Sequence, residues 1–427
     1  MNSPNKPAGL GALALDKGVP VAQTPEAGAN LFTHVPMPAA AILKPVLERN
    51  SRWMRDLLRV SGVSLAPHGK TTMIPEIFHM QIADGAWGIT LSTLHQVRTA
   101  RRFGIDRIFL ANILADPAEI RAIYEELEQQ PDFDFYCLID SAEALQALAA
   151  AFPKRERSRP INVLVELGFV GGRTGLRTVE AAMKLARAAS QAGPALRLVG
   201  VEAFEGLIKG RTEDERDRTA DRFVAGLSEL AIAAHKERLF AIPDFIVSAG
   251  GTNFIDLVVA QLSEVRKAAP QCRLLIRSGC YIAFDSGLYK MAFARMASRG
   301  SPGFASADLP KSALEIWARV LSRPEPGRLI VGAGKRDMGN DMEMPHLVKW
   351  LRPSLHGGAP APFDEEARVV ELNDQHAHVE IAESNPVAFG DFVAFGVSHP
   401  CTTFDKWRRM QLVNGDYSVA ATWSTYF

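Results

Sequence analysis

A lysine that directly follows a short apolar run is the first residue of chemical interest. Lys70 lies in the stretch APHGKTT. A lysine amine can form a Schiff base with a carbonyl compound, and it can act as a base. A lone lysine in a loop between a strand and a helix is usually a solvated surface group, so position alone does not assign it a role.

Two glycine-rich turns later in the chain are candidate phosphate sites. SAGGT contains Gly250 and Gly251, and SGCY contains Gly279. Glycines let the backbone approach an anion, which the N–H groups and the positive end of a following helix stabilise. The alternative is that these glycines only permit tight turns. A phosphate site opposite a lysine suits an aldehyde cofactor such as pyridoxal 5′-phosphate.

A possible metal motif lies near the C-terminus. His399 and Cys401 are separated by one proline in GVSHPCTTFDKW. Imidazole and thiolate together favour Zn²⁺, and two protein ligands leave positions open for water and substrate. His376 and His378 in NDQHAHVEI would share one face of a strand, either as a further contact or as ordinary exposed histidines.

A repeated strand–helix unit is expected to position these residues. Short apolar runs that end in turns alternate with amphipathic helical patterns. The expected strands are Val63–Pro67, Ala86–Leu91, Arg107–Ala111, Phe133–Ile139, Asn162–Leu167, Leu198–Phe204, Asp244–Ser248 and Arg273–Arg277. Helices between them include Ile74–Ala83, Leu94–Phe103, Pro117–Glu128, Ala142–Ala151, Val179–Ala192 and Asn253–Ala268, with expected N-caps at Asp116, Ser141 and Thr252.

Eight alternating units predict an α/β fold, a (β/α)8 TIM-like barrel, whose active groups lie at the carboxyl ends of the strands. A doubly wound open sheet is the alternative, but it usually has a Gly-rich turn after its first strand, where this chain has APHGK. After residue 301 short strand patterns predict a second, mostly β domain: Leu314–Leu321, Arg328–Val331, Ala367–Glu371, His378–Ile381 and Phe392–Phe395.

Three parts of the chain are therefore expected. Residues 1–47 form an N-terminal extension, loose up to about Asn30, in which Ala39–Leu47 could add a strand to the β domain. Residues 48–300 form the barrel that binds the cofactor. Residues 301–427 form the C-terminal β domain that carries the metal motif.

The composition argues against several classes of protein. The 427 residues include 48 basic and 48 acidic side chains, and this balance excludes a wide electrostatic surface for nucleic acid or acidic membranes. Four cysteines cannot form a disulfide framework in so long a chain, so we expect free thiols in a reducing compartment. Neither an apolar leader nor a membrane span is evident, and the expected location is the cytoplasm.

Four motifs in sequence order carry a family resemblance. APHGKTT, VELGFVGGRTGL, SAGGT and SGCYIAFD resemble the alanine-racemase-like (fold-type III) pyridoxal phosphate enzymes, above all the D-serine dehydratase and D-threonine aldolase group. The similarity spans about Ile42 to Trp407. It implies that Lys70 holds the cofactor and then removes the substrate α-proton, with Arg173 near the phenolic oxygen. The implied cofactor contacts are His68, Lys70, Arg173, Phe204, Ser248, Gly251, Thr252, Gly279, Cys280 and Tyr281.

One position departs from the family pattern. Phe204 stands where members of the dehydratase branch often carry a tyrosine able to touch the pyridine nitrogen. A phenyl ring can neither donate nor accept that hydrogen bond. The cofactor would then be a weaker electron sink, which disfavours racemisation more than elimination.

The metal motif separates the reactions of the group. His399-X-Cys401 resembles the family's metal motif, whereas the aldolases resemble a His-X-Asp version. The resemblance therefore implies a pyridoxal phosphate- and Zn²⁺-dependent dehydratase that converts a D-β-hydroxy amino acid, such as D-serine, to a 2-oxo acid and ammonia. Alternatives are a D-threonine aldolase-type lyase, a racemase, or a non-catalytic carrier of the cofactor. A homodimer is expected, without nucleic-acid or membrane partners.

Overall fold

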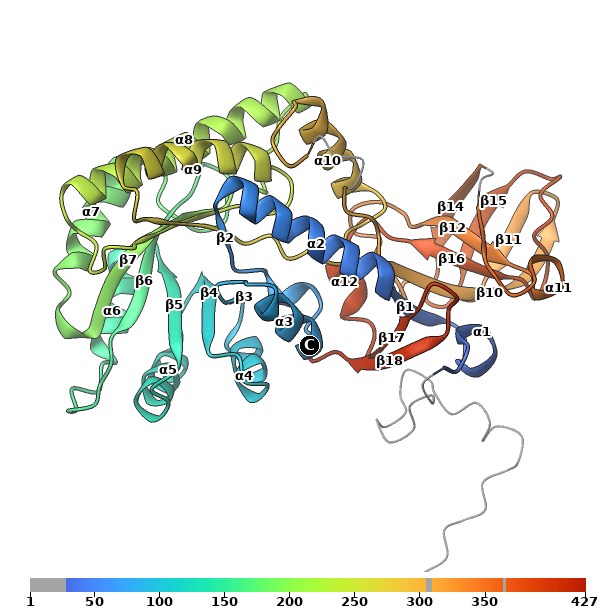
Figure 1. The fold of residues 1–427 in the computed structure, drawn as a ribbon, viewed down its shortest axis with the longest axis horizontal. Helices are drawn as coiled ribbons and strands as arrows, with labels where there is room; N and C mark the ends of the chain where they lie inside the picture. The colour runs from blue at the N-terminus through green and yellow to red at the C-terminus, as the bar shows by residue number, and fades with distance from the viewer. Residues whose placement is uncertain (1–27, 305–308, 364–365) are drawn as a thin grey trace, which may run out of the picture.

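The computed structural model describes residues 28–304, 309–363 and 366–427. Most of the expected loose extension lies outside the described residues. Two bodies are evident in Figure 1, a strand–helix body and a body of twisted strands. Among the described helices, none is long and apolar enough to cross a membrane.

Eight parallel strands form the centre of the first body. Their order is β2-β9-β8-β7-β6-β5-β4-β3, and β2 and β3 approach each other through a parallel bridge between His68 and Thr90. The strands are β2 (Ser64–Leu65), β3 (Ile89–Leu91), β4 (Arg107–Ile113), β5 (Asp134–Ile139), β6 (Ile161–Leu167), β7 (Leu196–Ala203), β8 (Ile246–Ala249) and β9 (Arg273–Ile276). The expected TIM-like barrel is confirmed, with each strand inside or close to its expected range.

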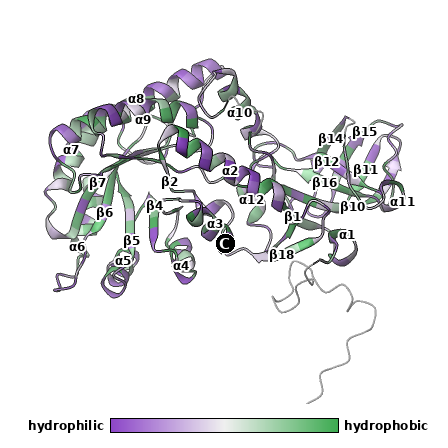
Figure 2. Cartoon of the chain, in the orientation of Figure 1, coloured by the Kyte–Doolittle hydropathy of each residue, from purple (hydrophilic) through white to green (hydrophobic). Residues whose placement is uncertain are grey.

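Helices cover the outside of this barrel (Figure 1). They are α2 (Lys44–Ser61), α3 (Pro75–Ala83), α4 (Leu94–Arg102), α5 (Pro117–Gln129), α6 (Ala142–Ala150), α7 (Val179–Ser190), α8 (Glu213–Lys236), α9 (Ile255–Ala268) and α10 (Leu288–Ser298). Figure 2 shows mostly hydrophobic barrel strands beneath helices that carry hydrophilic residues. This is the pattern of parallel strands buried on both faces.

Two of the three expected helix caps are confirmed. The Asp116 carboxylate accepts a hydrogen bond from the Ala118 N–H at 2.6 Å, and the Ser141 hydroxyl accepts one from the Ala144 N–H at 3.2 Å. The expected cap at Thr252 is wrong. Helix α9 begins at Ile255, so its N-cap residue is Phe254, which makes no side-chain capping hydrogen bond.

The second body is a ten-stranded sheet. Its main path runs β13 (Ala361–Pro362), β12 (His346–Leu351), β16 (Phe392–Gly396), β10 (Leu314–Glu325), β1 (Ala39–Leu43), β17 (Arg409–Val413) and β18 (Val419–Ser424). The remaining strands are β11 (Arg328–Val331), β14 (Ala367–Leu372) and β15 (Ala377–Ile381), and short helices α1 (Leu31–His34), α11 (Pro353–His356) and α12 (Cys401–Phe404) flank the sheet. β1 pairs antiparallel with β10 and parallel with β17. A segment that precedes the barrel in sequence therefore lies in the middle of the β domain.

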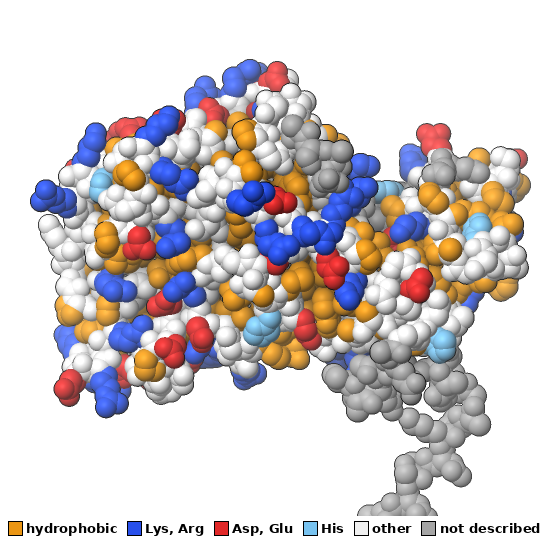
Figure 3. Space-filling model, in the orientation of Figure 1, with side chains coloured by type: hydrophobic (Ala, Val, Ile, Leu, Met, Phe, Trp, Pro, Cys, Tyr) orange, Lys and Arg blue, Asp and Glu red, His pale blue; other side chains and the backbone are white. Residues whose placement is uncertain are grey.

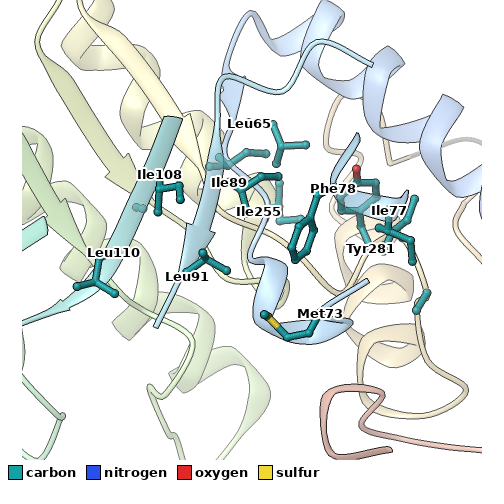
Figure 4. Packing of buried hydrophobic residues seen from close by; sticks show 14 of the residues in the cluster. Leu65, Met73, Ile77, Phe78, Ile89, Leu91, Ile108, Leu110, Ile255 and Tyr281 are labelled. Carbon is teal, nitrogen blue, oxygen red and sulfur yellow. The ribbon is translucent and has the colours of Figure 1, made fainter. Parts of the chain in front are cut away.

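Apolar packing fixes the first barrel loop. Met73, Ile77 and Phe78 are buried on the segment and helix that follow β2, and Tyr281 packs among them from the loop after β9 (Figure 4). The large side chains of this cluster hold the loops after β2 and β9 against each other. On the surface, Figure 3 shows basic and acidic side chains interspersed over most of the face in view, consistent with their equal numbers.

Candidate active site

A cavity of about 610 Å³ opens at the carboxyl ends of the barrel strands. This is the end at which barrel enzymes carry their active groups. Loops after β2, β3, β6, β7, β8 and β9 line it, together with residues of β4 and β5 and the segment of the β domain around α12. Its polar lining is His68, Lys70, Thr71, Ser92, Asn112, Glu166, Arg173, Thr174, Glu202, Thr252, Asn253, Arg277, Ser278, Cys280, Tyr289, Ser398, His399 and Cys401.

The cavity brings together the two groups that the sequence separates by more than 300 residues. Lys70 lies in a short 3-10 helix, Gly69–Thr71, directly after β2. His399 and Cys401 lie at the start of α12 in the β domain. All three line the same cavity. The charge of Lys70 is one of the influences on the Cys401 thiol, which places the amine in electrostatic range of the expected metal pair.

Cys401 has the properties of a metal ligand. Its Sγ lies 3.3 Å from the Cys280 Sγ and 3.5 Å from the Thr71 hydroxyl. The hydrogen bond from Cys280 lowers the pKa of Cys401 to about 7 against the opposing effect of burial, with help from Thr71 and Lys70. The same contact, together with burial, raises the pKa of Cys280. The contact between the two sulfurs thus favours ionisation of Cys401 over that of Cys280.

The neighbouring histidine is held through one ring nitrogen. His399 Nδ1 lies 2.6 Å from Asp341 Oδ2, and the other carboxylate oxygen accepts a hydrogen bond from the Thr402 hydroxyl at 2.6 Å. Partial burial would raise the pKa of Asp341, but the hydrogen bonds from Thr402 and His399 outweigh it and lower the pKa. Among the described residues, no three His, Cys, Asp or Glu side chains converge to hold one ion. His399 and Cys401 are the imidazole and thiol side chains that this segment brings to the cavity.

A buried ion pair forms the floor of the cavity. Arg277, at the end of β9, pairs with Glu202 on β7, and its Nη1 donates to the Ser248 hydroxyl at 2.6 Å. Burial raises the pKa of Glu202, and the charge of Arg277 opposes this rise and favours the ionised carboxylate. Burial likewise raises the pKa of Glu166 on β6, whose Oε1 accepts a hydrogen bond from Thr174 at 2.7 Å.

His68 is a neutral side chain in this environment. Burial, followed by the positive charges of Lys70, Arg277 and Arg173, lowers the pKa of His68 well below its usual 6.5. Its Nε2 lies 3.2 Å from the Ser92 hydroxyl. The ring is therefore available as a flat, uncharged surface beside Lys70.

Two backbone N–H groups of the glycine-rich turn after β8 form hydrogen bonds within the protein. The Glu205 carboxylate accepts hydrogen bonds from the N–H groups of Gly250 and Gly251, at 3.0 and 2.9 Å. The Thr252 hydroxyl lies 2.9 Å from that of Ser278. The backbone N–H of Gly251 is thus engaged within the protein, and both Gly251 and Thr252 line the cavity.

Two glycines are required by close approach rather than by a turn. A Cβ at Gly279 would lie 2.3 Å from the backbone oxygen of His68, and a Cβ at Gly251 would lie 3.0 Å from the Phe204 ring. The first distance leaves no room for a side chain, and at the second the Phe204 ring would have to shift by a few tenths of an ångström. The loops after β2, β7, β8 and β9 therefore meet at the cavity wall.

Arg173 lies over an aromatic ring in a stiff loop. Its guanidinium is 4.7 Å from the centre of the Phe204 ring. The side chain of Arg177 donates to backbone oxygens of Thr174 and Gly175 at 2.7 and 2.9 Å, and closes the loop on itself. Both Arg173 and Phe204 line the cavity, as the family motifs imply.

Two implied contacts lie outside the cavity. The Ser248 hydroxyl is fully buried and bonds to Arg277 and to the backbone oxygen of Leu275. Tyr281 points into the apolar cluster of Figure 4, where its hydroxyl accepts from Gln81 at 3.2 Å. Neither residue is among those that line the cavity, so their expected contact with the cofactor stays a prediction. His376 and His378 also lie apart from the cavity, with His378 bonded to Arg328 and Asn373.

Sequence reasoning missed the acidic and basic floor. Glu166 and Glu202 are charged residues near the ends of otherwise apolar strands, and Arg277 directly follows β9. A charged residue at the carboxyl end of a buried strand was the available signal. Asp341 gave no comparable signal, because it lies in an irregular stretch and approaches His399 only through the tertiary fold.

Several polar atoms in the cavity walls fit a polar cofactor. His68 Nδ1, Glu166 Oε2, Glu202 Oε2 and Asn253 Oδ1 are buried and have no hydrogen-bond partner among the described residues. Buried polar atoms are normally paired, so these atoms are suited to contact a bound molecule. The residues present, with Lys70 among them, therefore fit pyridoxal phosphate.

Two family models match the sequence. "Alanine racemase, N-terminal domain" matches residues 44–275, more than half of the 427, and "Putative serine dehydratase domain" matches residues 313–413. The chain belongs to the alanine racemase N-terminal domain family. This confirms the fold-type III group of pyridoxal phosphate enzymes that the motifs resemble.

Relatives and solved structures agree with this family. D-threo-3-hydroxyaspartate dehydratase of Delftia sp. (strain HT23) is 27% identical over 397 residues, 90% of this chain and 96% of that protein. The crystal structure of D-threonine aldolase from Filomicrobium marinum is similar over 94% of this chain and 98% of that one, with a TM-score of 0.75 and 24% identity. A D-threo-3-hydroxyaspartate dehydratase mutant in the metal-free form has a TM-score of 0.71 and 24% identity over 93% of this chain and 99% of that one. The structural comparisons show a shared fold.

Proposed function

We propose that this pyridoxal phosphate-dependent lyase is a dehydratase that converts a D-β-hydroxy amino acid to a 2-oxo acid and ammonia with the help of Zn²⁺. The observation that carries the proposal is that Lys70, His399 and Cys401 line one cavity. An amine that removes the α-proton and an ion that binds the β-hydroxyl must act on the same small molecule. Elimination of water needs both, because hydroxide is a poor leaving group near neutral pH.

When bound, pyridoxal phosphate supplies an electron sink for the charge left at the substrate α-carbon, and zinc supplies a Lewis acid for the β-hydroxyl. Lys70 is the residue that bonds the cofactor and then takes the α-proton. Arg173, stacked on Phe204, lies where the resemblance implies the phenolic oxygen of the cofactor. Thr252 and Gly279 would hold the phosphate from the loops after β8 and β9.

The choice of dehydration over carbon–carbon cleavage rests on Cys401. A thiolate is a softer ligand than a carboxylate and suits zinc, whereas the aldolases resemble a His-X-Asp version of the motif. The lowered pKa of Cys401, about 7, supports its role as an ionised ligand. The Delftia relative, a dehydratase, and the dehydratase mutant in the metal-free form add support to this proposal.

Product analysis tests the proposal. The holoenzyme with Zn²⁺ is incubated with D-serine, D-threonine and D-threo-3-hydroxyaspartate, and 2-oxo acid and ammonia are measured beside glycine and aldehyde. We expect oxo acid and ammonia in equal amounts. Glycine and an aldehyde would instead assign the aldolase reaction, which the similarity to the D-threonine aldolase fold keeps as the second candidate. If neither pair of products forms, both candidate functions are contradicted.

We also propose a homodimer whose partner covers the cavity mouth. Leu207 and Met342 line the cavity although their side chains are 44% and 53% exposed, and Val170, on the loop after β6, is 87% exposed. Exposed apolar side chains around a site are typical of protein interfaces. Sedimentation should give a particle with twice the mass of the 46.6 kDa chain, and a monomer at micromolar concentration would contradict the proposal.

A further inference from the structure

The segment 339–343 of the β domain runs alongside the residues that carry the expected metal ligands. The Gly339 N–H donates to the Thr403 hydroxyl at 2.9 Å, Asp341 contacts both Thr402 and His399, and the Glu343 N–H donates to the Ser398 hydroxyl at 3.1 Å. These contacts form a continuous series along residues 398–403. Residues 339–343 therefore pack along the turn that contains His399 and Cys401 over their whole length.

Asp341 is the member of this series that touches a ligand side chain. A carboxylate only accepts hydrogen bonds, so the 2.6 Å contact requires a proton on His399 Nδ1. With Nδ1 engaged in this way, Nε2 is the ring nitrogen left for a further ligand. Since His399 lines the cavity, Nε2 is the atom that can bind an ion there.

The carboxylate of Asp341 is itself held on both sides. Its Oδ1 accepts from the Thr402 hydroxyl at 2.6 Å while its Oδ2 binds His399. Thr402 directly follows Cys401 on α12. One carboxylate therefore connects the histidine to the helix turn that carries Cys401, and it restrains the imidazole ring against rotation.

We propose that Asp341 is a positioning residue for the metal pair, which fixes the tautomer and orientation of His399 so that Nε2 and the Cys401 sulfur bind one Zn²⁺. This inference rests on the proposed function, because it assigns Asp341 through the proposed zinc ligand. A carboxylate behind a ligating histidine makes the imidazole a better ligand, and loss of such a partner typically weakens metal binding about 10–100-fold.

Zinc affinity of the holoenzyme tests the proposal without reference to turnover. Zn²⁺ is titrated in competition with a chromogenic chelator against the wild type, Asp341→Asn and Asp341→Ala. We expect about 10–100-fold weaker binding in Asp341→Ala, and a smaller loss in the same direction in Asp341→Asn, whose amide oxygen can still accept from Nδ1. The visible absorbance of bound pyridoxal phosphate and the unfolding temperature of the metal-free protein should match those of the wild type.

The matched control is Asp374→Asn, which removes a carboxylate that pairs with Arg336 at 3.2 Å outside the cavity. It should keep wild-type zinc affinity. Wild-type affinity in Asp341→Ala, or an equal loss in Asp374→Asn, would overturn the assignment of Asp341 and leave the proposed dehydratase untouched. A loss of cofactor absorbance and of metal-free stability in Asp341→Ala would also overturn it, since the role would then be structural. Zinc binding with no lyase product would instead contradict the proposed function.

Discussion

At the residue scale, the cavity is defined by side chains whose charge states depend on one another. The hydrogen bond from Cys280, with a smaller effect of Lys70, lowers the pKa of Cys401. Burial, with the charges of Lys70, Arg277 and Arg173, lowers the pKa of His68. The cavity thus gathers positive charge around the position of an anionic cofactor and substrate. Such an arrangement favours binding of a phosphate and a carboxylate.

Replacement of Lys70 by alanine should abolish both turnover and the visible absorbance of the lysine-bound cofactor. The physical reason is that the variant lacks the amine that bonds the cofactor and takes the α-proton. Spectra and product assays on protein reconstituted with pyridoxal phosphate measure the two effects. Lys290→Ala, an exposed lysine on α10 outside the cavity lining, is the matched control. Retained absorbance and turnover in Lys70→Ala would show that another residue holds the cofactor.

His68 should make the cofactor-free protein less stable as the pH falls from 7 to 5. In the unfolded chain its pKa is near 6.5, whereas burial lowers the pKa in the folded protein well below that value. Below pH 6.5 the unfolded state gains a proton that the folded state does not bind, so the free energy of unfolding decreases by up to about 1.4 kcal/mol per pH unit. His68→Gln should lose this component, so its unfolding temperature should fall less over this range than that of the wild type. An unchanged pH dependence would mean that His68 is protonated in the folded protein; His376→Gln, an exposed histidine, is the control.

At the element scale, the sequence predicted those helix caps that depend only on residues close together in the chain. Asp116 before Pro117 and Ser141 before an apolar helix are caps whose partners lie two or three residues away, and both are confirmed. Thr252 has the same residue type, yet its hydroxyl bonds to Ser278 from the neighbouring strand end. Contacts of that kind depend on how loops meet in space, which residue type and spacing do not encode.

The same limit applies to the candidate site. Lys70, Arg173 and the His399/Cys401 pair were predictable because they lie in short motifs at strand ends or in a turn. Tyr281 lies in such a motif too, but its ring packs in the apolar cluster around Ile77 and Phe78 and not in the cavity. Arg277 and Glu202 come from different strands and pair only in the closed barrel.

Gly279→Ala tests the contact between the loops after β2 and β9. The new Cβ would lie 2.3 Å from the backbone oxygen of His68, so the two loops must separate. Overpacking of this kind typically costs about 1–3 kcal/mol. We expect a lower unfolding temperature and weaker binding of pyridoxal phosphate, measured by equilibrium dialysis. Gly415→Ala, where nothing lies within 4 Å of the added Cβ, is the control, and equal behaviour of the two variants would contradict the account.

At the scale of the whole molecule, both domains contribute side chains to one cavity. The barrel provides the lysine and the cofactor loops, and the β domain, completed by β1 from the N-terminal side, provides the expected metal pair. The alternation of strands and helices was sufficient to predict the barrel. Strands such as β12 and β17 were not predicted, because polar residues such as Lys349 and Gln411 interrupt their apolar runs.

The most direct test of the joint site is metal removal from the holoenzyme. After treatment with a chelator, the visible absorbance of the bound cofactor should persist, formation of 2-oxo acid and ammonia from D-serine or another accepted D-β-hydroxy amino acid should cease, and added Zn²⁺ should restore it. That result would place the lysine-bound cofactor and the ion in one reaction with separable roles. Undiminished formation of oxo acid by the metal-free enzyme would contradict the account.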